Sequence, residues 1–303
     1  MIQVSLGNFD DSMITSILES YRYLDSAKNT EDLLLDAISI ERKKSLRYGY
    51  KDVYYSKEIL QNTNYQKFEK VVLEIANAFE SNQFDSISWR LSKYHQNKTF
   101  QDDMLNILDI DHFHLGEKAN NNGRAGELLF IYYYQENLYL VDIFNHESFF
   151  NKRILEIIYE NWENSLEYDF SDLYQNSSYM DDKTRCQLFK KKHVNSTYEF
   201  TSHGKKKIIA TKDIMSNGVP IEDYTKSMYI HSEYEYFKNH IDFFSNALYQ
   251  YILNKYQISV ETLNIQYIWI KDFGECFFET QCNIKFNLDE NNDLIEICTC
   301  KAK

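Results

Sequence analysis

The spacing of apolar residues predicts a helical first third of the chain. Apolar positions recur three and four residues apart behind Asp10 and Asp11, again behind Asn29 or Thr30, and again from Phe68 to Phe79. This spacing gives a helix one face for a core, and the acidic or amide residues ahead of the first two runs are typical of helix caps. We therefore expect residues 1–105 to form a helical region.

The pattern changes near residue 106, where short β-type runs replace the helical spacing. His112–Leu115 alternates polar and apolar residues, and two dense aromatic and aliphatic runs follow at 127–134 and 138–144 around a Q-E-N turn. A helical stripe then ends in the pair N-W at residue 162. We expect residues 106–170 to form a small antiparallel β-meander with a covering helix.

The last part of the chain, residues 171–303, mixes both patterns. Two β-type runs flank Gly204 and predict a hairpin, and apolar positions between 224 and 256 repeat at the spacing of one long helix. Three further strands are expected at 264–270, 276–286 and 294–300. The predicted fold class is α+β, with three consecutive regions.

Composition limits the classes of protein that fit. The chain has 303 residues, of which 43% are hydrophobic, which is too apolar for a disordered chain. There is no run of 18 apolar residues, so we expect no membrane-spanning helix and no membrane partner. The first residues lack the basic and apolar segments of a signal peptide, and we expect a cytoplasmic protein.

Charge is distributed unevenly along the chain. The net charge is −13, which disfavours a general nucleic-acid coat, but residues 183–207 alone carry a net charge of +7. Such a patch suits RNA, DNA or an acidic partner, and it is equally typical of a solvated loop. The candidate binding residues are Lys190, Lys191, Lys192, Lys205, Lys206 and Lys207.

Histidines supply the main candidate for chemistry. His112 and His114 are two apart, so in a strand they point to the same face, while Phe113 and Leu115 point to the other. In a meander, the start of the first strand, the loop after it and the end of the third strand come within reach of one another. The predicted site is His112, His114, Arg124 and His146, with Asp111, Glu127 and Asp142 as orienting carboxylates.

Three interpretations of this set remain open. The histidines have the side chains of a divalent-metal site, although no second ligand motif accompanies them, and we assign no metal ligand and no cofactor. They also suit general acid and base catalysis in a metal-independent ribonuclease, with Arg124 stabilising the developing charge on phosphorus. The third interpretation is structural, with histidines at the rim of a sheet satisfied by nearby carboxylates or lining a binding surface.

The same residues carry a resemblance to a bacterial family. The series D-H-F-H-L-G, G-E-L-L-F, L-V-D-I-F-N-H and L-E-I-I-Y-E-N-W, within residues 86–165, resembles proteins that share H-x-H-L-G, L-L-F, H and N-W in this order. That family has no assigned activity and is often found on mobile elements or among defence genes. Its members often have Pro after the N-W pair, where this chain has Glu163. The matching positions are His112, His114, Leu115, Gly116, Leu128, Leu129, Phe130, His146, Asn161 and Trp162.

A second likeness, at the level of the fold alone, is to RelE-like mRNA-cleaving toxins. These have a small meander, an Arg-bearing loop, and a basic or His residue after a later strand. The likeness implies that Arg124 stabilises charge and that His146 is an acid or base. Those toxins are far shorter, and the net charge of −13 also departs from them.

The leading hypothesis is therefore a bacterial anti-phage or toxin-like effector that acts on RNA as an endoribonuclease, with RNA or the ribosome as partner. The alternative is a non-catalytic interaction component, such as a sensor, immunity protein or regulator, with a protein partner encoded nearby. A metal-dependent hydrolase is the third hypothesis. The sequence leaves open whether the chain is an enzyme.

Overall fold

A computed structural model divides the chain into two compact units. It describes residues 3–91, 102–117, 126–149, 151–166, 181, 184, 187, 197–215, 217–271, 274–289 and 294–298. The terminal unit combines Met1–Arg42 with Asp223–Lys303, and the central unit is Lys43–Glu222. This division differs from the three consecutive regions expected from the sequence, because the two ends of the chain pair in one sheet.

The terminal unit is a mixed sheet packed against helices. Its strand order is β1-β8-β9-β10-β11, and β1 runs parallel to β8 while the other neighbours are antiparallel. The strands are β1 (Gln3–Leu6), β8 (Thr262–Ile270), β9 (Glu275–Thr280), β10 (Lys285–Leu288) and β11 (Leu294–Cys298). The helices are α1 (Phe9–Ser20), the first part of α2 (Thr30–Arg47), most of α10 (Ile221–Asn239), and α11 (Ile241–Tyr256). An aromatic cluster around Phe237, which is fully buried, forms the centre of this core.

Several predicted boundaries in the terminal unit are wrong. The side chain of Asn8, not Asp10, caps α1 by accepting from the backbone N–H of Asp10 at 2.9 Å. The single helix expected at 224–256 is two helices that break at His240. The strand expected at 276–286 reverses in a tight turn, where Asn283 adopts a φ of 59°. Hydrophobic periodicity misses such breaks because the apolar spacing continues across them.

The central unit is built on a four-stranded sheet with the order β2-β5-β4-β3. The predicted antiparallel meander is confirmed as β3 (Ile110–His114), β4 (Glu127–Tyr134) and β5 (Asn137–Asn145). A strand within the region expected to be helical, β2 (Asp52–Tyr55), adds to β5 in parallel. This fourth strand leaves β3 at one edge of the sheet.

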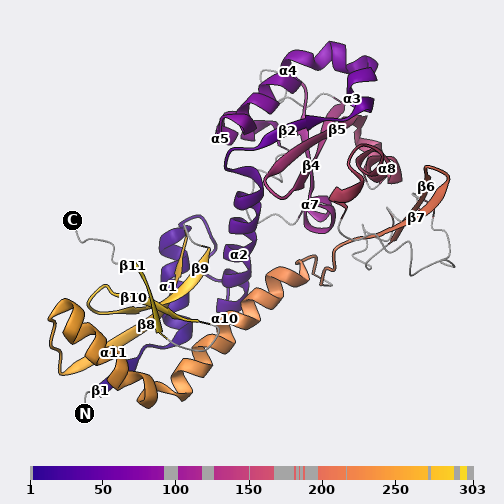
Figure 1. The fold of residues 1–303 in the computed structure, drawn as a ribbon. Helices are drawn as coiled ribbons and strands as arrows, with labels where there is room; N and C mark the ends of the chain where they lie inside the picture. Colours follow the sequence, from indigo (N-terminus) through magenta and orange to yellow (C-terminus); the bar gives the residue numbers. More distant parts are fainter. Residues whose placement is uncertain are drawn as a thin grey trace. The chain divides into compact units, whose positions relative to one another are not determined.

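Helices cover both faces of this sheet (Figure 1). On one face lie α3 (Lys57–Gln61), α4 (Thr63–Glu80) and α5 (Phe84–Ile87). On the other lie α7 (Asp103–Leu108), the predicted covering helix α8 (Lys152–Asn161), and a hairpin of β6 (Thr197–Ser202) and β7 (Lys205–Ala210). The hairpin turns at Gly204, as predicted, with a φ of 73° that glycine adopts without strain. Short 3-10 helices are η1 (Ser88–Arg90), η3 (His146–Ser148) and η4 (Glu163–Ser165).

The observed fold class is α+β, as predicted. Within the described ranges, no helix combines the length and the apolar character that crossing a membrane requires.

Burial in the central sheet gives a direct stability test. Leu129 is fully buried in the interior strand β4, so Leu129→Ala should lower the free energy of unfolding by about 2–5 kcal/mol through lost burial and an unfilled cavity. The matched control is Leu60→Ala on α3, where the leucine is 57% exposed and the change should stay within about 0.5 kcal/mol. Urea unfolding followed by circular dichroism measures both, and equal losses would contradict the assigned burial.

Candidate functional site

Strand β3 places the two histidines of D-H-F-H-L-G on one face of the central sheet. His112 pairs with Phe130 and His114 with Leu128, whereas Phe113 pairs with Leu129 on the other face. The predicted alternation is therefore confirmed, because Phe113 and Leu115 lie in the core beneath α4. His112 and His114 are also buried, with exposed fractions of 3% and 2%.

His146 joins the two histidines from the end of β5. It opens the short helix η3 directly after that strand and is exposed. The ring centroids of His114 and His146 are 5.4 Å apart, and those of His112 and His114 are 6.2 Å apart. Phe149 packs edge-on against His112, with ring centroids 4.8 Å apart, and stacks on His146 at 5.9 Å. The structure thus gathers three of the four predicted site residues, and we call them the histidine cluster.

The other predicted binding residues divide into two groups. Arg124, Lys190, Lys191 and Lys192 lie outside the described residues. Of the three lysines on β7, Lys206 pairs with Glu199 at 2.7 Å and Lys207 lies 4.6 Å from the centre of the Tyr159 ring. Lys205 is exposed at the hairpin turn. The described part of the basic patch is therefore partly neutralised by its own hairpin.

A buried ion pair, which was not predicted from the sequence, lies on the face of β3 opposite to His112 and His114. Arg47, at the end of α2, donates from Nε at 2.8 Å and from Nη2 at 2.7 Å to Oδ2 of Asp111. Asp111 has no exposed surface. Burial alone would lower the pKa of Arg47, but attraction to Asp111 raises it, so the guanidinium stays charged. No sequence signal marks this pair, because its members are 64 residues apart.

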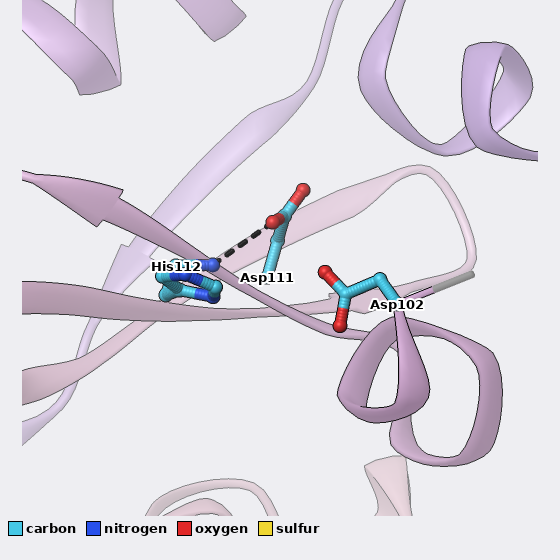
Figure 2. Close-up of side chains that lie close together, drawn as sticks. All are labelled: Asp102, Asp111 and His112. Carbon is cyan, nitrogen blue, oxygen red and sulfur yellow. Dashed lines mark hydrogen bonds between the residues drawn. The ribbon is translucent and has the colours of Figure 1, made fainter. Parts of the chain in front are cut away.

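Asp102 completes a cluster of titratable groups at the edge of the sheet. It caps α7 by accepting from the backbone N–H groups of Met104 and Leu105. Burial and then the nearby charge of Asp111 raise the pKa of the Asp102 carboxyl. Figure 2 shows Asp102 reaching from the start of the helix toward β3, where Asp111 accepts a hydrogen bond from the backbone N–H of His112 at 2.9 Å.

Asp102, Asp111 and His112 have the side chains of a metal site, and one ligand atom from each lies within 4.8 Å of the others. The neighbouring contacts make these residues a poor cation site. One oxygen of Asp111 accepts from Arg47, and the other accepts from the backbone of His112. The guanidinium of Arg47 already supplies the positive charge that this carboxylate needs.

The remaining predicted carboxylates are bonded to other residues. Glu127 pairs with Lys67 at 3.0 Å, and Asp142 accepts from the side-chain amide of Asn62 at 2.7 Å. Burial raises the pKa of Asp142. The expectation that Glu127 and Asp142 orient the histidines therefore finds no support in these contacts.

Arg90 holds the end of the D-H-F-H-L-G stretch, and it was also missed from the sequence. Its buried guanidinium donates to the carbonyl of Gly116 at 2.9 Å and to that of His114 at 3.3 Å. It also pairs with Glu74 at 2.9 Å. Arg90 therefore fixes the backbone directly after His114.

The N-W pair at the end of α8 has a structural role. Asn161 accepts from the backbone N–H of Lys57 at 2.9 Å and donates to Glu58 at 2.6 Å, which ties α8 to α3. Trp162 packs on Tyr139 with ring centroids 4.7 Å apart. Trp162 is thus a packing residue.

Comparison with known proteins adds no relative. Searches of protein-family models, curated proteins and solved structures each return no match. The resemblance to the bacterial family and the likeness to RelE-like toxins therefore remain predictions.

The ion pair between Arg47 and Asp111 should be essential for the stability of the fold. Arg47→Met leaves the buried charge of Asp111 without its partner, so we expect a loss of about 3–5 kcal/mol in the free energy of unfolding. Adding Asp111→Asn removes that charge and should recover about half of the loss or more. Arg153→Met is the control, since that arginine is 40% exposed and its ion pairs should contribute at most about 1 kcal/mol. Urea unfolding measures the free energy of unfolding of each variant. If the loss in the double variant equals the sum of the losses in the two single variants, Arg47 and Asp111 do not stabilise the fold mainly by pairing with each other.

The raised pKa of Asp102 predicts that the free energy of unfolding falls as the pH rises. Above its ordinary pKa of 3.8, the folded chain keeps a proton that the unfolded chain has released. Stability is therefore lost as the pH rises from about 4 to the raised pKa. Asp102→Asn removes this loss and retains a side chain that can cap α7. Its free energy of unfolding should therefore match that of the wild type below pH 4 and exceed it at pH 7. A variant that is less stable than the wild type at pH 7 would show that the carboxylate is needed in its charged form.

Proposed function

We propose that the chain is an RNA-cleaving effector of a bacterial anti-phage or toxin system, with the histidine cluster as its acid and base. One observation carries the proposal. An exposed imidazole, His146, lies beside a buried one, His114, with ring centroids 5.4 Å apart. His114 is the last residue of β3 and His146 directly follows β5, so the fold itself brings them together.

The chemistry follows from what imidazoles do near neutral pH. A base takes the proton of the ribose 2′-hydroxyl, and the 2′-oxygen then attacks phosphorus. The bond to the 5′-oxygen breaks, and an acid gives that oxygen a proton, which leaves a 2′,3′-cyclic phosphate and a 5′-hydroxyl. Imidazole suits both steps because its ordinary pKa is near 6.5.

Burial assigns different tasks to the three histidines. His146 is exposed and is the residue that contacts RNA in this proposal. His114 lies behind it and holds or exchanges a proton with it. His112, which is covered by Phe149, keeps the face of β3 packed. The charge-stabilising role expected for Arg124 remains part of the proposal on sequence grounds alone.

In this proposal the protein works in the bacterial cytoplasm, where RNA and ribosomes are available. The exposed Lys205 and its neighbours on β7 offer phosphate contacts, although Lys206 is already paired with Glu199. The negative net charge of the chain calls for a localised contact with RNA rather than a broad electrostatic one.

A second candidate function is a non-catalytic interaction component of a defence or mobile-element system. The burial of His112 and His114 favours it, since exposed fractions of 3% and 2% are those of core residues. In that case the histidines pack the sheet, and a protein encoded nearby is the partner. The third hypothesis, a metal-dependent hydrolase, is weakened by the pairing of Asp111 with Arg47.

Induced expression in a bacterial host separates these candidates. We expect growth arrest together with RNA cleavage for the wild type, and a loss of cleavage of about 100-fold or more for His146→Ala. Since His146 is exposed, that variant should fold normally, and His114→Gln tests the buried member with a side chain of similar size. His231→Ala, an exposed histidine of the terminal unit, is the control and should cleave as the wild type does.

The outcomes are distinct. Arrest without RNA cleavage, or cleavage unchanged in His146→Ala, would overturn the ribonuclease proposal. Cleavage by purified protein that stops with a chelator would favour the metal-dependent hydrolase. No arrest, with stable capture of a neighbouring gene's product by wild type and variant alike, would favour the interaction component.

A further inference from the structure

Glu233 is a buried carboxyl group in the core of the terminal unit. It lies on α10 and is only 8% exposed. The hydroxyl of Tyr267 on β8 donates a hydrogen bond to its Oε2. Its other oxygen, Oε1, is buried and has no hydrogen-bond partner among the described residues. Burying a charge that is poorly paired costs free energy, so the neutral form of this carboxyl group suits the core better than the charged form.

No basic side chain neutralises this carboxyl group in the part of the chain that the structure describes. Asp111 and Asp223 are equally well buried, but each of them pairs with an arginine. Lys226 lies seven positions before Glu233 on the same helix, and its ammonium group donates to the carbonyl of Gly274 at 2.7 Å instead. An ionised Glu233 therefore loses its hydration without gaining a cation as partner.

The other titratable groups around Glu233 are acids and phenols. Tyr267 faces it from β8, and Glu275 and Cys276 lie near it on β9. Tyr229, one turn earlier on α10, has a pKa that is raised by burial and by the charge of Glu233. Burial is the main cause that raises the pKa of Glu233, and the charge of Glu275 adds to it, while the hydrogen bond from Tyr267 opposes them. The surroundings thus favour the protonated form in the folded chain.

The aromatic residues next to Glu233 attach α10 to the sheet. The ring centroids of Tyr234 and Tyr267 are 6.1 Å apart, and those of Phe237 and Phe278 on β9 are 4.2 Å apart. Glu233 therefore stands within the contact between the helix and the strands. A charge formed at this position requires water, and water reaches it when the helix moves away from the strands.

We infer that Glu233 is a pH-sensitive switch for the packing of α10 on β8 and β9. While its carboxyl group is protonated, the helix stays packed on the strands. When the proton passes to the solvent, the carboxylate draws water into the contact, and α10 opens locally around Glu233. This inference concerns the terminal unit and does not depend on the proposed ribonuclease activity.

The sign of the pH dependence follows from the raised pKa. The unfolded chain releases the proton of Glu233 near the ordinary pKa of 4.5, whereas the folded chain keeps it to a higher pH. The stability that this group contributes is therefore fully present below about pH 4.5 and is lost as the pH rises through the raised pKa. Between these two values, the equilibrium constant for opening rises by up to about tenfold for each pH unit.

Hydrogen exchange of the full chain across a pH series tests the switch. After correction for the intrinsic pH dependence of exchange, the amides of residues 230–239 should exchange at least about tenfold faster at pH 8 than at pH 5 in the wild type. Glu233→Gln has nearly the same size and cannot ionise, so its corrected exchange should stay at the low-pH level throughout. Corrected exchange that is independent of pH in the wild type, or equally dependent on pH in Glu233→Gln, would overturn the inference.

Two controls separate this effect from other titrating groups. Glu235→Gln changes a surface glutamate on the same helix, which pairs with Lys238, and it should alter the corrected exchange of residues 230–239 by less than about twofold. Asp102 also has a raised pKa but belongs to the central unit. Amides of residues 127–134 in the central sheet should therefore exchange alike in the wild type and in Glu233→Gln.

Tyr267→Phe tests the same carboxyl group without altering it. The hydroxyl of Tyr267 lowers the pKa of Glu233 by donating to its charged form, so its removal should raise that pKa further. We expect the pH at which α10 begins to open to move upward in this variant. The test holds even if Glu233→Gln fails to fold, and an opening pH that stays the same or moves downward would show that Glu233 is not the titrating group.

Discussion

The burial of Asp111 is the constraint on which the central unit depends. A carboxylate with no exposed surface requires a partner, and Arg47 provides it from the last turn of α2. That pairing fixes the end of α2 against β3, and the backbone N–H of His112 donates a hydrogen bond to the other carboxylate oxygen of Asp111. β3 is an edge strand of the four-stranded sheet, and Asp102 reaches toward it from the cap of α7 (Figure 2).

Alternation along β3 directs the side chain of Asp111 to one face of the sheet and those of His112 and His114 to the other. Asp111 contacts Arg47 on one face of the sheet, whereas His112 and His114 lie on the opposite face, which His146 also reaches. Arg90 adds a second anchor at the carbonyls of His114 and Gly116. Two arginines from other segments thus hold β3, Arg47 at Asp111 and Arg90 at the backbone of His114 and Gly116.

The two units place their unusual features differently. In the central unit, polar side chains are buried beside the sheet and only His146 of the histidine cluster is exposed. In the terminal unit, the buried residues around Phe237 are mostly apolar and aromatic.

The sequence by itself determined the α+β class, the three antiparallel strands of the meander, their covering helix, the hairpin at Gly204, and the shared face of His112 and His114. All of these depend on local periodicity and turn residues, which neighbouring positions encode. Only the tertiary structure decided that β1 joins β8, that β2 joins β5, and that Arg47 neutralises Asp111. Each of these contacts joins residues far apart in the chain, and a single sequence has no local signal for them. The burial of the two histidines was decided in the same way, because it depends on which segments cover β3 rather than on β3 itself.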